Sequence, residues 1–206
     1  MSRPVLRTAP VQARSQMTLQ RILDATAAVV DDVGIEGVRT QIVADRAGVA
    51  IGTVYRFFCD RPALIRALSE RNLERYVTKV SEFLAADESL EHWWDAIAGT
   101  IDIFVELHRT EPSFRLLRFG DVIDVTLIDS EHASNDLLAG AFRELMIHRF
   151  DVKDTPDLQL HLEVVTTISD ALLKRAFLYD PDGQAEMIAE CKALVREYLG
   201  SRLVQS

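Results

Sequence analysis

The sequence predicts an all-α protein with a small N-terminal three-helix domain, which contains a helix-turn-helix, and a larger C-terminal helical domain. Apolar residues recur at spacings of three and four along most of the 206 residues, which is the period of helices that bury one face. Residues 81–206 show little of the alternation expected of strands. The 48% hydrophobic and 27% charged content is ordinary for a globular protein.

We expect three parts along the chain. Residues 1–14 carry two prolines and three arginines without any helical period, which predicts a flexible N-terminal arm. Residues 15–60 should form the three-helix domain, and residues 61–206 the second domain, with the helix from about 61 to 80 connecting the two.

The formal net charge of −9 is unevenly distributed. Residues 1–80 hold 12 Lys and Arg against 8 Asp and Glu, a net charge of +4, whereas residues 81–206 hold 11 against 24, a net charge of −13. An acidic part is most often only a solvated surface, so this division favours nucleic-acid binding weakly.

The first helix should begin near Gln16 and bury one apolar face. Gly34 is expected to end it in a left-handed conformation. Thr26 is the polar interruption of the buried face, and its hydroxyl can donate to the carbonyl of Ile22 one turn earlier.

Two short helical stretches follow, separated by a sharp turn at Gly48. Thr40 is expected to cap the first stretch, which runs to about Ala47 with Ile42 and Val43 among its apolar residues. Neither stretch could bury a core alone, so both must pack on the first helix.

The second stretch is expected over Ile51 to Phe58, with Val54 and either Phe57 or Phe58 pointing inward. Asp60 should then cap a longer helix that has proline in its first turn.

Two short helices braced by neighbours form the arrangement that lets one helix lie in the major groove of DNA. Thr, Gln, Tyr and Arg side chains can donate to phosphate oxygens or base edges. Such residues cluster here at helix starts and on the second short helix, namely Thr40, Gln41, Thr53, Tyr55, Arg56 and Arg61. A small helical bundle with incidental polar residues remains the alternative.

Over residues 15–68 the sequence resembles the TetR family of transcriptional regulators. The resemblance is specific because many residue types recur in register over about 50 positions. These residues are Ile22, Leu23, Ala25, Gly34, Thr40, Ile42, Ala44, Gly48, Gly52, Thr53, Tyr55, Phe58 and Leu64.

The resemblance implies that one set of residues faces DNA, with Tyr55 against a phosphate. This set is Thr40, Ala50, Thr53, Tyr55 and Arg56. Arg14 resembles an arm residue that reaches the DNA backbone or minor groove.

Three positions depart from the family pattern. Thr26 stands where alanine is frequent and concerns packing only. Ala50 stands where serine is frequent, so it can offer only an apolar contact, such as one to a thymine methyl group. Arg61 replaces a frequent lysine, and a phosphate contact there stays plausible.

The C-terminal domain is expected to hold a small-molecule pocket, because a broad apolar stripe from Trp93 to His108 suits a helix that lines a cavity. Each single lining residue is more often core than ligand contact, and a mainly hydrophobic ligand is indicated. The candidates are Trp94, Ile97, Phe104, His108, Leu117, Phe142 and Met146.

The last two helices are expected to follow Thr155-Pro156 and the turn at residues 180–183. Both carry apolar stripes that need partners. The resemblance implies that this antiparallel pair supplies half of a four-helix bundle in a homodimer, although both helices could simply close the core of one protomer.

No cofactor or metal is expected, because the five histidines show no ligand spacing and neither Cys59 nor Cys191 offers a ligand set. Both cysteines should be reduced thiols. The sequence lacks a nucleophile elbow, a phosphate-binding glycine loop and a His-Glu-x-x-His motif, so an enzyme is not expected.

We therefore expect a cytoplasmic, not membrane-bound, homodimer that binds a palindromic double-stranded operator as a repressor and is released by a small, mainly hydrophobic effector. A transcriptional activator of the same fold is the first alternative. A helical adaptor or enzyme that does not bind DNA is the second.

Overall fold

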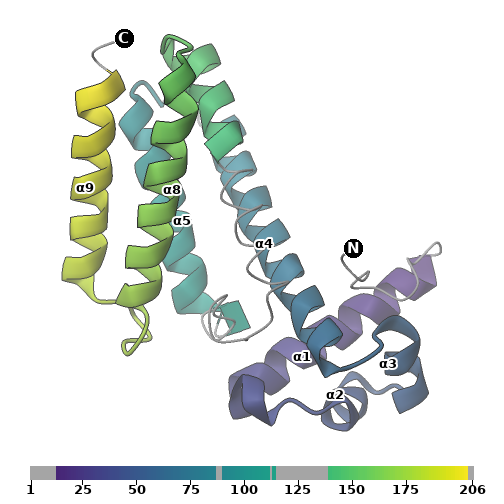
Figure 1. The fold of residues 1–206 in the computed structure, drawn as a ribbon. Coiled ribbons are helices and arrows are strands. Elements are labelled where there is room, and N and C mark those ends of the chain that lie inside the picture. Colours follow the sequence, from purple (N-terminus) through teal and green to yellow (C-terminus); the bar gives the residue numbers. More distant parts are fainter. Residues whose placement is uncertain (1–12, 87–89, 112, 115–138, 204–206) are drawn as a thin grey trace. The chain divides into compact units, whose positions relative to one another are not determined.

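The computed structural model describes residues 13–86, 90–111, 113–114 and 139–203. Every regular element among them is a helix, which confirms the predicted fold class (Figure 1). The helices are α1 (Ala13–Gly37), α2 (Thr40–Ala47), α3 (Ile51–Phe57), α4 (Arg61–Ala86), α5 (Trp93–Thr110), α8 (Pro156–Ala176) and α9 (Ala185–Leu203), with a further helical stretch over residues 139–150.

The chain divides into two compact units. The N-terminal unit consists mainly of residues up to Glu74, and the C-terminal unit begins at Arg75 and includes α5, α8 and α9. The first half of α4 therefore belongs to the N-terminal unit, in which Leu64 and Leu68 are fully buried.

Helix α1 begins at Ala13, inside the stretch expected to be an arm. Thr26 is fully buried and its hydroxyl donates to the Ile22 carbonyl at 2.7 Å, as predicted. Gly34 has φ 69° and ψ 171°, which breaks the helix before its last residues. Positive φ favours glycine here, because a Cβ strains that backbone conformation.

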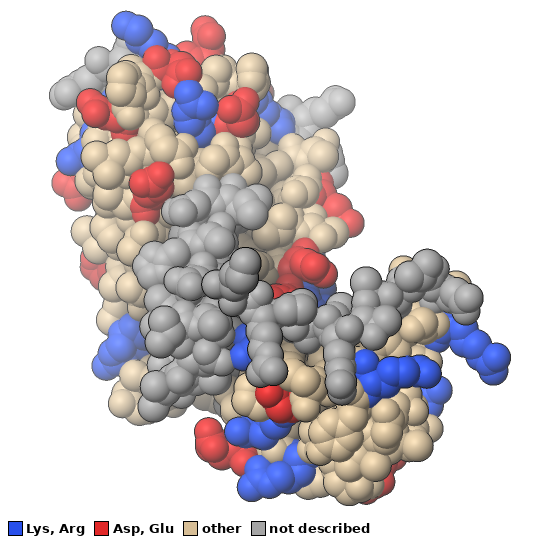
Figure 2. All heavy atoms as spheres, turned by 45° about the vertical axis from the view of Figure 1, so that its right-hand side comes forward, with Lys and Arg blue, Asp and Glu red and all other residues tan. Residues whose placement is uncertain are grey.

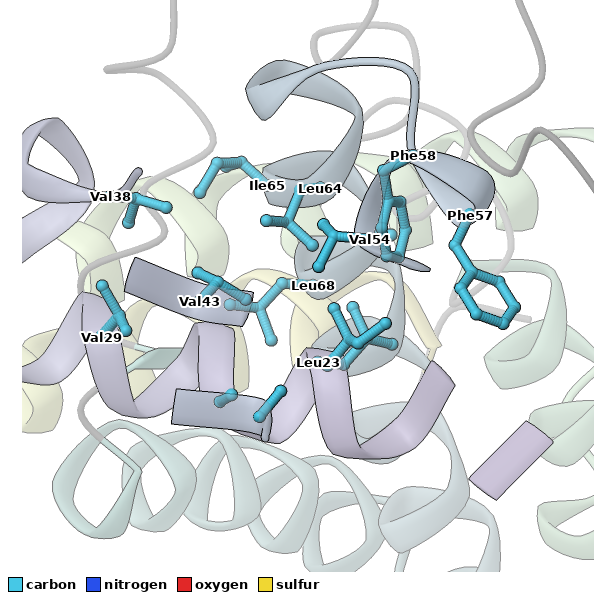
Figure 3. Close-up of a cluster of buried hydrophobic side chains, with 14 of the residues drawn as sticks. Leu23, Val29, Val38, Val43, Val54, Phe57, Phe58, Leu64, Ile65 and Leu68 are labelled. Atoms are coloured by element: carbon cyan, nitrogen blue, oxygen red, sulfur yellow. The ribbon is translucent and has the colours of Figure 1, made fainter. Parts of the chain in front are cut away.

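Apolar side chains from all four helices close the core of the N-terminal unit (Figure 3). Both Phe57 and Phe58 are buried, where the sequence predicted one of them. Helix α3 ends at Phe57, and Phe58 has extended backbone angles of −125° and 127°. This change of direction lets two consecutive side chains reach the same core.

The core of the C-terminal unit combines α5, the stretch 139–150, α8 and α9. Helix α8 begins after Thr155 with Pro156 in its first turn, as predicted. Helices α8 and α9 lie side by side and antiparallel (Figure 1). Within the described part of the chain, no helix combines the length and the apolar character needed to cross a lipid bilayer.

The turn between α8 and α9 requires glycine at residue 183. Gly183 has φ 78°, and its amide donates to the Asp180 carbonyl at 3.0 Å. A Cβ added to it would lie 2.8 Å from the ring of Phe177. The predicted turn at residues 180–183 is confirmed.

Candidate nucleic-acid interface

Helices α2 and α3 form the predicted helix-turn-helix, with Gly48 at the turn. Gly48 is left-handed, with φ 62° and ψ 40°, and its amide donates to the carbonyls of Ala44 and Asp45. The Val49 amide also donates to the Ala44 carbonyl, at 3.0 Å. These bonds close the end of α2 in the way that left-handed glycine caps do.

The two helices have eight and seven residues, which is too short for stability without tertiary packing. Val43 and Ala44 of α2 and Val54 of α3 are fully buried and anchor the pair on the core. Ile42 points outward, with 42% of its surface exposed, although the sequence placed it among the apolar residues of this helix.

The N-cap prediction for Thr40 is wrong. Arg39 is the N-cap residue, with extended backbone angles of −133° and 135°, and its carbonyl accepts from the Val43 amide at 3.1 Å. Thr40 is the first helical residue, so its hydroxyl is available for another partner.

That partner is Tyr55. The Thr40 Oγ1 and the Tyr55 hydroxyl lie 3.1 Å apart, and this hydrogen bond joins α2 to α3. The Tyr55 side chain is 42% exposed. Two of the predicted DNA-contacting residues therefore present adjacent hydroxyl groups on the same surface, where both could bind one phosphate.

The other predicted contacts on these two helices are also accessible. Arg56 and Ala50 are exposed and Thr53 is half-buried. Gln41 is exposed, and its amide donates to Asp45 Oδ1 at 2.8 Å, so this hydrogen bond must open before Gln41 contacts DNA with the same group.

Arg14 and Arg61 lie outside the helix pair. Arg14 is exposed in the first turn of α1. Arg61 is half-buried and donates to the Ile35 carbonyl at 2.6 Å, with Glu36 3.7 Å away. Arg61 thus ties the start of α4 to the last residues of α1, beyond the break at Gly34, a role that sequence reasoning did not assign to it.

Sequence reasoning also missed Arg21. From α1 it donates to the Ala47 carbonyl at 2.6 Å and to the Gly48 carbonyl at 3.4 Å. These partners are 26 and 27 residues away in the sequence, and no local periodicity signals such a contact.

Basic side chains are frequent on the surface of the N-terminal unit (Figure 2). Several of its arginines are exposed, namely Arg14, Arg21, Arg39, Arg46 and Arg56. Arg46 is paired with Asp32 at 2.5 Å. Guanidinium groups at exposed positions are suited to binding a phosphate backbone.

Six of the seven candidate effector contacts lie in the described part of the C-terminal unit. Ile97, Phe142 and Met146 are buried in one cluster, with Trp94 and Phe104 packed against it. Leu117 lies outside the described residues.

The sixth candidate, His108, is buried among aromatic rings. Its ring stacks on Phe104 at 4.0 Å between centroids and lies 4.8 Å from the ring of Phe177. Its Nδ1 is 2.9 Å from the Phe104 carbonyl.

An ion pair on α8, which sequence reasoning missed, lies within the C-terminal unit. Asp170 and Lys174 are 2.6 Å apart, and their side chains are only 22% and 24% exposed. Burial raises the pKa of Asp170 to about 7 and lowers the pKa of Lys174 to about 8. Burial, together with the charge of Asp170, raises the pKa of Tyr76.

Two other features bear on ligands. An open depression of 550 Å³ is lined by Arg143, Asp154, Thr155, Pro156 and Gln159, none of which is a candidate effector contact. Among the residues that the structure describes, no three His, Cys, Asp or Glu side chains gather as a metal site requires.

Together, the glycine turn, the buried brace of α1 and the exposed polar face define a helix-turn-helix protein. A model described as "Bacterial regulatory proteins, tetR family" matches residues 22–68. A model described as "Tetracyclin repressor-like, C-terminal domain" matches residues 91–203, more than half of the chain. The chain belongs to the TetR family.

Two curated relatives resemble a part of the chain. The transcriptional repressor KstR of Mycolicibacterium smegmatis is 43% identical over 60 residues, which is 29% of this chain and 29% of the relative. KstR of Mycobacterium tuberculosis is 40% identical over 67 residues, 32% of this chain and 30% of the relative. The matched stretch thus spans less than a third of the length of these relatives.

Solved structures match over most of the chain. A TetR-family regulator from Streptomyces coelicolor has a TM-score of 0.72 and 35% identity, covering 89% of this chain and 98% of its own. A TetR-family regulator from Pectobacterium atrosepticum has a TM-score of 0.73 at 16% identity, covering 95% and 98%, which shows the fold alone.

Proposed function

We propose that this protein is a transcriptional repressor that binds a palindromic operator as a homodimer and leaves it when a small, mainly hydrophobic effector binds the C-terminal unit. The exposed polar face of α2 and α3 carries this proposal. The KstR relatives are named repressors, which favours repression over activation.

In this proposal α3 lies in the major groove. The adjacent hydroxyls of Thr40 and Tyr55 bind the DNA backbone, and Arg56 and Thr53 face base edges. Ala50 contributes an apolar contact. The remaining proposed contacts to DNA come from Gln41, Arg14 and Arg61.

The proposed dimer forms through α8 and α9. Leu160 and Ile168 of α8 and Leu194 of α9 are 55%, 36% and 48% exposed, which is unusual for large aliphatic side chains on neighbouring helices. A second copy of the same helix pair would bury them in a four-helix bundle. Two recognition helices would then reach half-sites about 34–36 Å apart.

The proposed effector site uses the cluster around Ile97, Phe142 and Met146, with Trp94 and Phe104 beside it. Leu117 and His108 complete the set. An effector that prefers the conformation unable to bind DNA shifts the population away from the operator. A coupling of about 1–3 kcal/mol would weaken operator binding roughly 5- to 150-fold.

The test of DNA binding is selection of bound sequences from random duplex DNA. The parent chain should enrich a palindrome, and the Tyr55→Phe, Arg56→Ala double variant should lose it while keeping its helical circular dichroism spectrum. The matched control, Tyr179→Phe with Arg196→Ala, changes the same residue types at exposed positions of the C-terminal unit and should retain the palindrome.

No enrichment by the folded parent chain would contradict the proposal and favour an adaptor or an enzyme. Equal loss in the double variant and the control would also contradict it, because binding would then not depend on α3.

A further inference from the structure

Arg21 connects α1 to the turn of the helix-turn-helix. Its backbone is fixed, because Leu19, Ile22 and Leu23 around it are buried in the core. Its Nη2 lies 2.6 Å from the Ala47 carbonyl and 3.4 Å from the Gly48 carbonyl. The side chain therefore ties a rigid helix to the last residue of α2 and to the turn.

The bonds of Arg21 complete a helix cap. Backbone amides of the turn already occupy the carbonyls of Ala44 and Asp45. Arg21 donates to the carbonyls of Ala47 and Gly48, which follow them. A guanidinium group also suits the partial negative charge at the C-terminal end of a helix.

Gly48 leaves room for this contact. A Cβ added to Gly48 would lie 3.3 Å from Arg21 Nη2, closer than nearly all real Cβ contacts. Glycine at this position thus serves the left-handed turn and also the approach of the arginine.

We propose that Arg21 is a positioning residue for recognition helix α3, which it holds at its working angle by fixing the turn between α2 and α3. This inference rests on the proposed function. Helices of eight and seven residues depend on outside contacts for their orientation, and Arg21 supplies one at the point where the chain changes direction. Direct binding of Arg21 to a DNA phosphate is the competing role.

The two roles differ in salt dependence. Loss of one phosphate contact lowers the slope of log affinity against log salt concentration by about 0.9 and weakens binding to all duplexes alike. Loss of positioning misplaces the side chains that read bases, each of which discriminates by a factor of roughly 5 to 150. It should therefore weaken binding to the operator more than binding to a scrambled duplex.

The experiment measures affinity for the palindrome enriched by the parent chain and for a scrambled duplex of equal length, at several salt concentrations. We expect Arg21→Ala to lose about tenfold in operator affinity, with unchanged scrambled-duplex affinity and salt slope. Arg21→Lys, which keeps a cation for the carbonyls, should restore part of the loss. Arg75→Ala is the control, because it removes the same charge from an exposed position of α4 that lies outside the N-terminal unit.

Equal loss on both duplexes with a slope lower by about one would overturn positioning in favour of a phosphate contact. An unchanged operator affinity would overturn it as well. Should Arg21→Ala fail to fold, the Arg21→Lys and Arg21→Gln variants carry the same comparison. The glutamine variant should then lose more operator affinity than the lysine variant.

Hydrogen exchange of the free protein separates this inference from the proposed function. The amides of Gly48 and Val49, which close the turn, should exchange faster in Arg21→Ala than in Arg75→Ala. Equal exchange would overturn the role of Arg21 even if DNA binding holds. If the amides exchange faster in Arg21→Ala but the parent chain enriches no duplex, the proposed function is contradicted. The contact of Arg21 with the turn would still be supported.

Discussion

Both units contain buried hydroxyls that donate to a carbonyl of their own helix, such as Thr26 and, in the C-terminal unit, Thr100, but the C-terminal unit also buries most of an ion pair. In the N-terminal unit the buried Thr26 and Ser69 hydroxyls each donate to a carbonyl four residues earlier in their own helices. In the C-terminal unit the mostly buried Asp170 and Lys174 pair with each other, and burial moves the pKa of each toward its neutral form. The first arrangement depends on local backbone only, whereas the second depends on how the unit packs around the pair.

This difference is related to the groups that each unit exposes and buries. The N-terminal unit exposes polar groups on α2 and α3, and its largely apolar core fixes these two short helices. The C-terminal unit places the carboxyl group of Asp170 near the buried Tyr76 side chain. We therefore expect the packing of the apolar core to be most important in the N-terminal unit, and the buried charged groups to be most important in the C-terminal unit.

The largest expected effect tests the rigidity of the N-terminal unit. Phe58 is fully buried, and Phe58→Ala should lower the free energy of unfolding by about 3–5 kcal/mol, because a large cavity is left. The control in the other unit is Leu162→Ala, also fully buried, which should cost about 2–5 kcal/mol. Urea unfolding measures both.

Operator affinity then separates the two variants. At a temperature where both are folded, Phe58→Ala should weaken operator binding much more than Leu162→Ala, because α3 ends next to Phe58. Equal weakening would show that the comparison between the units is wrong.

A second prediction concerns the exposed apolar face of the C-terminal unit. Ile168→Glu should weaken dimerisation by about 100-fold, equivalent to roughly 2.7 kcal/mol, because a carboxylate would be buried without a partner. Sedimentation equilibrium measures the change. Ala189→Glu is the control, since this exposed residue lies on a different side of α9 from Leu194. A dimer unchanged by Ile168→Glu would place the interface elsewhere.

Sequence reasoning succeeded where structure depends on near neighbours. The end of α2 before Gly48, the bond of Thr26, the cap at Asp60 and the start of α8 at Pro156 all follow from spacings of a few residues. The Asp60 prediction, for example, is confirmed by Oδ1, which accepts from the Ala63 amide at 2.8 Å. Such signals need only one helical turn of sequence.

Sequence reasoning failed where a contact joins segments that are far apart in the sequence. Thr40 was expected to cap α2, but its hydroxyl bonds Tyr55 fifteen residues away. Arg21 and Arg61 each reach a carbonyl 26 residues away. A long arginine side chain on an exposed helix face has the same local pattern whether it contacts water, DNA or a distant turn, so spacing could not reveal these roles.

The buried ion pair on α8 was not predicted, for a related reason. Asp170 and Lys174 are four residues apart, a spacing that ordinarily indicates an exposed pair on a helix surface. Only the packing of Tyr76 and its neighbours shows that this pair is mostly buried. Spacing alone therefore does not distinguish a buried pair from an exposed one.

The smallest expected effect tests that pair through pH. Because the folded-state pKa of Asp170 is about 7, above its ordinary value of 3.8, the folded chain holds a proton that the unfolded chain releases between about pH 4 and 7. Asp170 therefore contributes stability at low pH that is lost as the pH rises through this range. Asp170→Asn should remove this loss.

Between pH 5 and 7.5 the parent chain should lose about 1–2 kcal/mol more stability than Asp170→Asn in urea unfolding. Asp102→Asn is the control, because it changes the same charge in an exposed pair with Lys192 and should keep the profile of the parent. Identical profiles for the parent and Asp170→Asn would mean that the Asp170 carboxyl is as well solvated as one on the surface. The buried ion pair would then no longer distinguish the C-terminal unit from the N-terminal unit.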